Sequence, residues 1–175
     1  DLTDPDSVDA MLRAIADRWG GVDILVNYAG GWAGGRPLGE IPLADWDALV
    51  DEVLRTAVVI NRAVVGHMAE RGWGRIVNIA ASAAEQPRAM QAAYNVAKAG
   101  VVALTASVAL DYGTRGVVAN CLSPGVIATA EEHAARAGAQ RMRWVSPEEL
   151  AALAIHLCGE GAAVNGENIL LLGHT

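Results

Sequence analysis

Four short apolar runs alternate with four long helix-forming stretches along this chain. We predict buried strands over residues 22–27, 75–80, 116–122 and 169–172, and helices over residues 6–18, 44–71, 94–112 and 147–158. Parallel strands that are joined through long helices need right-handed crossovers, which leave helices on both faces of the sheet. The pattern therefore predicts an α/β fold with a doubly wound parallel sheet in three layers: helices, sheet and helices.

The composition indicates one compact domain over residues 1–175. Hydrophobic residues make up 53% of the chain and charged residues 19%, which argues against disorder. The formal net charge is −7 and the arginines are scattered without a basic block, so we expect no nucleic-acid partner. No cluster of His, Cys and acidic residues has ligand spacing, so we also expect no metal site.

Three features of the sequence predict a cytoplasmic protein with no membrane partner. We find no uninterrupted apolar run of the ~18 residues that a membrane span needs. The chain opens on acidic residues, which are not typical of a signal peptide. Cys121 and Cys158 both lie in apolar contexts and are expected to be reduced structural thiols.

The only lysine of the chain, Lys98, stands four positions after Tyr94. Residues i and i+4 share a face of a helix, so the phenol and the ammonium can point at one place. A cation beside a phenol favours the phenolate and lowers its pKa from about 10 toward the range of a general acid or base. A core tyrosine and a surface lysine in chance register would show the same spacing, so the surrounding motifs decide.

The chain has no glycine-rich phosphate-binding turn. Open α/β domains that bind dinucleotides normally begin with a strand, a glycine-rich turn and a helix whose amino terminus holds a phosphate. Here the first predicted element is a helix, and the glycine-rich stretch 30–35 lacks the G-x-G-x-x-G spacing and is followed by Arg36 and Pro37. We expect that stretch to be a flexible loop, and cofactor binding by this chain alone to be weak.

Five ordered motifs resemble the short-chain dehydrogenase/reductase family over essentially the whole chain. They are DLTD at 1–4, NYAG at 27–30, RIVNI at 75–79, YNVAK at 94–98 and SPGVIAT at 123–129, followed by matches to the family's last helix and strand at 147–149 and 164–166. The resemblance implies an NAD(P)-dependent oxidoreductase with an incomplete Rossmann-like fold. It also implies that the first βαβαβ half, with its glycine-rich segment, is missing from this chain.

The resemblance assigns roles to individual residues. Tyr94 is the implied general acid/base at the carbinol oxygen while a hydride moves to or from the nicotinamide, and Lys98 lowers the tyrosine pKa and binds the ribose hydroxyls. The implied contacts to NAD or NADP are Asp1, Asn27, Ala29, Gly30, Tyr94, Lys98, Pro124, Gly125 and Thr129. The implied substrate is a small-molecule alcohol or ketone.

Two family positions are altered in this sequence. Val53 stands where the family has an asparagine that supports a proton-relay water, and Ala81 stands where it has the serine that polarises the carbonyl. Ser82 follows directly, and one residue of slip at a strand end would redirect its side chain. Ser82 is therefore our candidate for the third catalytic residue. We interpret Asn61 as a helix-surface residue and Asn78 as a loop-facing one, without a catalytic role.

Three functions stay open from the sequence. The chain is a family oxidoreductase, or a degenerate non-catalytic subunit that pairs with an active family partner, or an acid–base lyase or isomerase that uses the Tyr94–Lys98 pair without hydride transfer. Tyr94, Lys98 and Thr129 favour the first function, whereas Val53 and Ala81 favour the second. We expect a homo-oligomer, or a hetero-oligomer within the family, built on helices 44–71 and 94–112. Substrate identity, reaction direction and the choice between NAD and NADP are not encoded in these residues.

Overall fold

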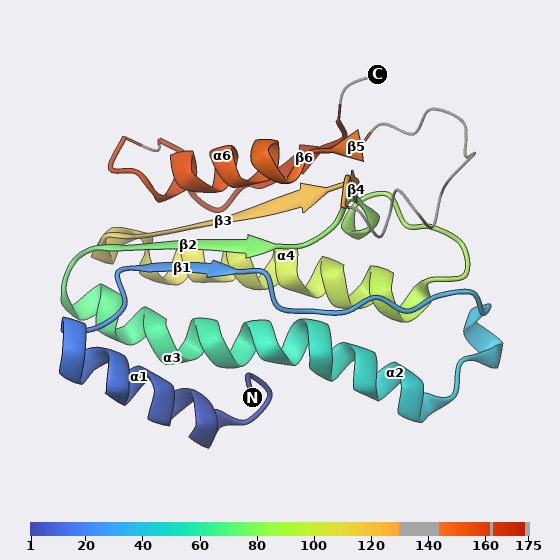
Figure 1. The fold of residues 1–175 in the computed structure, drawn as a ribbon, viewed down its shortest axis with the longest axis horizontal. Coiled ribbons are helices and arrows are strands. Elements are labelled where there is room, and N and C mark those ends of the chain that lie inside the picture. The colour runs from blue at the N-terminus through green and yellow to red at the C-terminus, as the bar shows by residue number, and fades with distance from the viewer. Residues whose placement is uncertain (130–143, 162, 174–175) are drawn as a thin grey trace.

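A four-stranded parallel sheet forms the centre of the molecule (Figure 1). The computed structural model describes residues 1–129, 144–161 and 163–173. The strands, in the spatial order β1-β2-β3-β6, are β1 (Ile24–Asn27), β2 (Gly74–Ile79), β3 (Val117–Pro124) and β6 (Asn168–Leu171). All three pairings between neighbouring strands are parallel, which confirms the predicted sheet.

Helices cover both faces of the sheet, although unequally. One face carries α1 (Pro5–Trp19), α2 (Leu43–Val50), α3 (Thr56–Glu70) and α4 (Ala92–Tyr112), and the other carries α6 (Pro147–Cys158) (Figure 1). Asp4 caps α1 by accepting hydrogen bonds from the backbone amides of Asp6 and Ser7. Ser146 and Glu149 form a capping box at the start of α6. The predicted three-layer α/β fold is confirmed.

The predicted helix 44–71 contains a change of helical type. A π-helical turn, Asp51–Arg55, joins α2 to α3. Val53 lies in this turn and is 1% exposed. Single π turns inside α-helices occur often at functional sites, and this one faces the loop that follows β1.

Several short elements were not predicted from the sequence. β4 (Val126–Ile127) and β5 (Trp144–Val145) form a two-residue parallel pair beyond the end of β3. Three 3-10 turns occupy Leu38–Glu40, Ser82–Ala84 and Gly113–Arg115. These elements are too short to show a hydrophobic period, and they depend on the framework around them.

The two central strands are buried on both faces, which explains their continuous apolar sequence. Every residue of β2 is buried, and in β3 all but Val118 are. On one face, Ile76 and Val117 pack with α1, α3 and α4; on the other, Val77 and Leu122 pack with α6.

β1 is an outer strand of the described sheet, as expected for the run 22–27. Its side chains Leu25 and Asn27 turn toward the helices, whereas Ile24 and Val26 remain 46% and 48% exposed. Because successive side chains of a strand alternate between faces, the uncovered pair lies on the α6 side of the sheet. An outer strand presents unpaired backbone N–H and C=O groups, so an apolar one such as β1 favours pairing with another β-strand.

A buried amide network corrects the interpretation of Asn61 and Asn78 as surface and loop residues. Both side chains are 0% exposed and exchange two hydrogen bonds, of 2.9 and 3.1 Å. The Asn78 amide also donates to Thr105 Oγ1 at 3.0 Å, and its carbonyl oxygen accepts from Asn27 at 3.2 Å. Asn78 lies in β2 and faces α3, so these partners satisfy polar groups that burial would otherwise penalise.

A helix can reach the length and mean hydropathy of a membrane span even with polar residues inside it, so the expected lack of an uninterrupted apolar run does not cover α4. Within the described part of the chain, one helical segment, Ala92–Arg115, passes that test with a mean hydropathy of 1.4. In the structure, 39% of this window is buried, and α4 packs against β3 and α3. Core helices of soluble proteins share this composition, and α4 also buries the polar side chains of Lys98 and Thr105.

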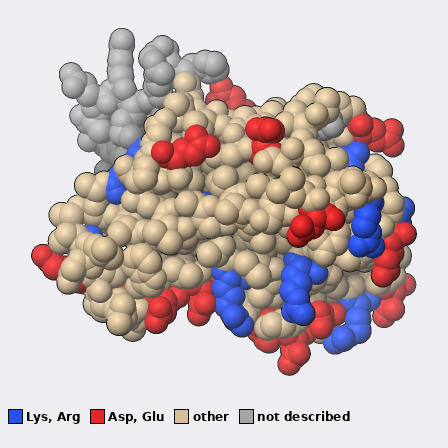
Figure 2. All heavy atoms as spheres, turned by 180° about the vertical axis from the view of Figure 1, so that it is seen from behind, with Lys and Arg blue, Asp and Glu red and all other residues tan. Residues whose placement is uncertain are grey.

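The face opposite to that of Figure 1 carries a broad area without charged side chains. Acidic and basic residues are intermixed around this area (Figure 2). Val96 and Leu110, both on α4, are 54% and 82% exposed. The exposed part of α4 is therefore more apolar than a solvated helix face usually is.

Candidate active site

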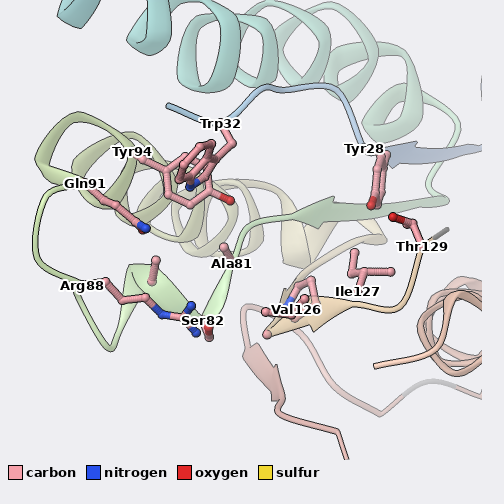
Figure 3. A pocket seen from close by; sticks show the side chains of 13 residues that line it. Tyr28, Trp32, Ala81, Ser82, Arg88, Gln91, Tyr94, Val126, Ile127 and Thr129 are labelled. Atoms are coloured by element: carbon pink, nitrogen blue, oxygen red, sulfur yellow. The ribbon is translucent and has the colours of Figure 1, made fainter. Parts of the chain in front are cut away.

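A pocket of about 370 Å³ opens where β2 and β3 end and α4 begins (Figure 3). In parallel α/β sheets, ligands bind at this carboxyl edge of the strands. Thirteen residues line the pocket: Tyr28, Trp32, Ala81, Ser82, Ala83, Arg88, Gln91, Tyr94, Pro124, Gly125, Val126, Ile127 and Thr129.

A second pocket of about 280 Å³ adjoins the first. It shares seven lining residues with the larger pocket, Tyr94 and Ala81 among them, and adds Gly30, Gly31, Ile79, Ala80 and Lys98. Tyr94 therefore stands in the wall common to the two pockets. A group on the Lys98 side and a group on the opposite side can both reach the tyrosine.

The predicted pair is brought together near the start of α4. The Lys98 ammonium lies 5.9 Å from the centre of the Tyr94 ring and donates a 2.9 Å hydrogen bond to the carbonyl oxygen of Ile79. Lys98 is only 6% exposed. The end of β2 therefore holds the lysine, and the i, i+4 spacing puts the tyrosine beside it.

Burial governs the pKa values of both groups. Burial raises the pKa of the Tyr94 phenol; Tyr28 adds to this rise and the Arg88 charge opposes it. Burial lowers the pKa of Lys98 to about 8, partly offset by Cys121. The net shift of the Tyr94 pKa is therefore upward, because burial of the phenol outweighs the opposing charge of Arg88. The lowering of this pKa by Lys98 stays a prediction.

The glycine-rich loop after β1 closes the smaller pocket. Gly30 has φ 147°, and a Cβ there would lie 3.6 Å from both Lys98 Nζ and Val53 Cγ2. A Cβ on Gly31 would meet the carboxylate of Glu52, so only glycine fits without a shift. Farther along, the amide of Gly35 donates to the carbonyl of Met90 at 2.8 Å, which anchors the loop predicted to be flexible.

The predicted cofactor contacts divide into two groups. Gly30, Pro124, Gly125 and Thr129 line the two pockets, together with Tyr94 and Lys98. Asn27 is buried below the site; its side chain accepts a hydrogen bond from the backbone amide of Ala29 at 3.3 Å and thereby shapes the turn after β1.

Asp1 is not brought to the site. Its carboxylate accepts hydrogen bonds from Thr3 N and Oγ1, both at 2.8 Å, and Asp1 lines neither pocket around Tyr94. A contact between Asp1 and an adenine stays a prediction.

Ala81 and Ser82, at the end of β2, differ in which pocket they line. Ala81 lines both pockets, whereas Ser82 lines only the larger one and is 4% exposed. Ser82 is drawn beyond Ala81 and well separated from the Tyr94 hydroxyl (Figure 3). The 3-10 turn that begins at Ser82 produces this direction.

The residues of the larger pocket that sequence reasoning missed include Tyr28, Trp32, Arg88 and Gln91. Tyr28 and Trp32 are 59% and 63% exposed, although both are large aromatic residues. Their position in the sequence was the available signal, because Tyr28 lies within the NYAG motif at 27–30 and Trp32 follows it closely. Arg88 and Gln91 carried no motif, because their position depends on how the segment before α4 folds.

Comparison with known proteins establishes the family. Residues 1–140 match the family model described as short chain dehydrogenase. The chain therefore belongs to the short-chain dehydrogenase family of NAD(P)-dependent oxidoreductases, and the predicted family, fold class and enzyme class are confirmed. Among the described residues, no group of three or more His, Cys, Asp or Glu could hold a metal ion.

Three relatives illustrate the match. The D-beta-hydroxybutyrate dehydrogenase of Rhizobium meliloti is 30% identical over 99% of this chain and 75% of its own length. The dehydrogenase subunit BbsD of Thauera aromatica is 42% identical over 74% of this chain but only 51% of its own length. The structure of a gluconate 5-dehydrogenase from Burkholderia cenocepacia, in complex with NADP and tartrate, is 32% identical, covers 99% of this chain and 72% of that one, and superposes with a TM-score of 0.89.

We predict that the stability of the chain rises with pH because of Lys98. Its pKa is about 8 in the folded state and 10.5 as a free side chain, so the unfolded state binds more protons between these values. Charging the buried amine destabilises the fold at low pH, and this cost falls as pH increases. Urea unfolding should show a gain of about 1 kcal/mol between roughly pH 7.5 and 9.

Lys98→Met should remove this rise, since the buried cation is replaced by an apolar side chain. Above about pH 9, Lys98→Met should lose stability, because burial raises the pKa of Cys121 to about 11 and the unfolded thiol ionises first. In the wild type, the continuing rise from Lys98 offsets this loss up to about pH 10.5. A wild-type profile that is flat or falls between pH 7.5 and 9 would contradict the prediction.

Proposed function

We propose that this protein transfers a hydride between NAD or NADP and a small-molecule alcohol or ketone, with Tyr94 as general acid/base. The observation that carries this proposal is the position of Tyr94 in the wall between two adjoining pockets, with the buried ammonium of Lys98 on one side. The substrate would lie in the larger pocket and the nicotinamide and ribose in the smaller one. Substrate and cofactor then meet at the tyrosine.

The residues present fit the nicotinamide–ribose half of the cofactor. The Lys98 ammonium lies at the smaller pocket and suits ribose hydroxyls, while Gly30 and Gly31 leave the backbone open to close approach. Pro124, Gly125 and Ile127 complete the wall. The cofactor, when bound, supplies the hydride acceptor or donor.

The tyrosine carries the proton. Its raised pKa keeps the phenol protonated at neutral pH, so it can donate to a carbonyl oxygen during reduction. Lys98, with a pKa of about 8, is mostly charged at the same pH and stabilises the phenolate that forms as the proton leaves. In the direction of oxidation the phenol must first lose its proton, and the phenolate beside Lys98 then accepts the proton of the alcohol.

We further propose Ser82 as the hydroxyl that polarises the carbonyl. Ala81 cannot donate a hydrogen bond, and Ser82 is the next residue that lines the substrate pocket. Its side chain would have to turn toward Tyr94 when a substrate binds, because it is drawn well away from the Tyr94 hydroxyl (Figure 3). Val53 likewise offers no amide for a relay water.

Replacing Tyr94 tests the proposed function. Tyr94→Phe keeps the ring and removes only the proton donor, so kcat/KM for ketone reduction should fall about 1,000-fold with stability changed by less than about 1 kcal/mol. The assay follows NADH or NADPH oxidation at millimolar cofactor, with cofactor deuterated at the transferred position.

Deuterium should appear at the carbinol carbon of the product. If the reaction is run in deuterated water, deuterium from the solvent at a product carbon without cofactor oxidation would favour the lyase or isomerase alternative. Turnover that is indifferent to Tyr94→Phe would contradict the assignment of the general acid.

Exchanging the two residues at the end of β2 tests the role of Ser82. Ser82→Ala should lower kcat about 100-fold if this hydroxyl stabilises the developing oxyanion. Ala81→Ser in the same background should restore activity, because position 81 borders both pockets. Ser82→Ala with unchanged kcat would show that the hydroxyl takes no part in the chemistry.

We propose that the chain self-associates through α3 and α4 and works in the cytoplasm. The exposed apolar side chains Val58, Val96 and Leu110 support the interface, and the two free cysteines support the compartment. A hetero-oligomer would use the same face; one relative, BbsD, is itself called a subunit. Fractionation that finds the native protein outside the cytoplasm would contradict the second proposal.

A charge on the α4 face should dissociate the oligomer. Leu110→Asp, at a position 82% exposed, should weaken association tenfold or more in sedimentation equilibrium, because a carboxylate would lose its hydration in an apolar interface. Ile155→Asp is the matched control, since Ile155 is 73% exposed on α6. A wild-type monomer at micromolar concentration, or equal effects of the two substitutions, would contradict this interface.

A further inference from the structure

The larger pocket carries a positive charge that the proposed hydride transfer does not use. Arg88 is the only charged side chain among its lining residues, and none of the described residues that line either pocket is acidic. The chain as a whole has 20 acidic residues and a net charge of −7. A positive pocket on an acidic protein attracts anions to that site in particular.

The backbone of Arg88 is held in place next to the tyrosine. Asn95, the residue after Tyr94, donates from its side-chain amide to the Arg88 carbonyl at 2.9 Å and accepts from the Arg88 amide at 3.5 Å. These two hydrogen bonds tie the loop before α4 to the first turns of the helix. The position of Arg88 is therefore fixed relative to Tyr94, even though its side chain is exposed.

The Arg88 guanidinium has no protein partner within the described part of the chain: it takes part in neither of the ion pairs and in no side-chain hydrogen bond there. Arg88 and Gln91 line the same pocket, and both side chains are drawn extending from the segment before α4 into it (Figure 3). The donors of both side chains are available to a ligand.

A strained residue sets the direction of Gln91. Met90 has φ 63°, the only positive φ outside glycine in the described chain, and its carbonyl accepts the hydrogen bond from Gly35. A Cβ on Gly34 would lie 3.0 Å from Gln91 Cγ and from the Trp32 ring, so the loop packs tightly on this side chain. Left-handed backbone at a non-glycine residue is costly and is concentrated at ligand-binding sites.

We propose that Arg88, assisted by Gln91, binds a carboxylate of the substrate, so that the alcohol or ketone taken by this site is a hydroxy acid or the matching keto acid. The inference rests on the proposed function for the reaction, but it concerns recognition only. A planar guanidinium matches a carboxylate with two parallel hydrogen bonds, and the Gln91 amide can donate a third. Asn95 is then a positioning residue that acts through Arg88.

The electrostatics of the tyrosine agree with this geometry. The charge of Arg88 opposes the rise that burial imposes on the Tyr94 pKa, so the guanidinium and the phenol interact electrostatically. A carboxylate bound at Arg88 would lie on the substrate side of the tyrosine, away from Lys98.

Binding of two matched probes tests the proposal without requiring turnover. We would titrate 3-hydroxybutyrate and butane-1,3-diol, which share a carbon skeleton and differ in the carboxylate, into the ¹⁵N-labelled chain and follow the Trp32 indole signal. The acid should bind at least tenfold more tightly than the diol, and added salt should reduce the difference. Arg88→Met should remove the preference, and Arg88→Lys should retain part of it.

Two further variants separate recognition from folding and from chemistry. Arg13→Met, in a different pocket between α1 and α3, should keep the full preference. Asn95→Ala should weaken binding of the acid several-fold and leave that of the diol unchanged, whereas a purely structural loss would weaken both. Tyr94→Phe should keep the preference for the acid while abolishing turnover.

Equal affinity of the two probes, no detectable binding of the acid, or a preference that survives Arg88→Met would overturn the proposal. Selective binding of the acid in a chain that never transfers hydride would leave it standing and refute the proposed reaction. Hydride transfer to neutral ketones with no preference for acids would support the proposed reaction and overturn the carboxylate site.

Discussion

The side chain of Asn78 joins the sheet to the helices on one of its faces. A strand buried on both sides has little room for polar groups, yet this amide sits at 0% exposure in β2. It meets Asn27 on β1, Asn61 on α3 and Thr105 on α4. A buried amide stabilises a fold only when its partners are all in place, so these four elements must reach one mutual arrangement. That arrangement also puts the ends of β1 and β2 and the start of α4 around one site.

The lysine depends on the same framework. Among the described residues its buried ammonium has no carboxylate partner, and the carbonyl of Ile79 at the end of β2 is its acceptor. Desolvation without an opposing charge explains why its pKa falls to about 8. Val53, in the π turn opposite, offers only methyl groups, so the lysine has no side-chain amide beside it there. The cation is held by backbone, which leaves its remaining protons free for a ligand.

The sequence predicted most of the framework and part of the site. Continuous apolar runs and well-capped helices located β1, β2, β3, β6 and the long helices within a few residues, because local propensity and burial agree there. β4 and β5 could not be predicted, since two residues show no period. The burial of Asn61 and Asn78 was missed because isolated amides normally indicate surface, and only the fold shows that these two satisfy each other.

Within the site, residues in a local motif were predictable and those brought together by loops were not. Tyr94 and Lys98 are neighbours by helical geometry alone. Arg88, Gln91 and Trp32 meet only because the loop 30–35 is hydrogen-bonded to the segment before α4.

The charges of the two pockets explain why one site can be assigned two kinds of ligand group. Lys98 is buried, so water screens its charge little and the charge acts strongly on a ligand group that contacts Tyr94. Arg88 lies at the exposed rim, where water screens it, so it favours a ligand that neutralises it directly with hydrogen bonds over one that is merely nearby. Arg88 lines only the larger pocket and Lys98 only the smaller one, and none of the described residues that line either pocket is acidic. This separation lets the inner cation assist proton transfer while the outer cation selects the substrate.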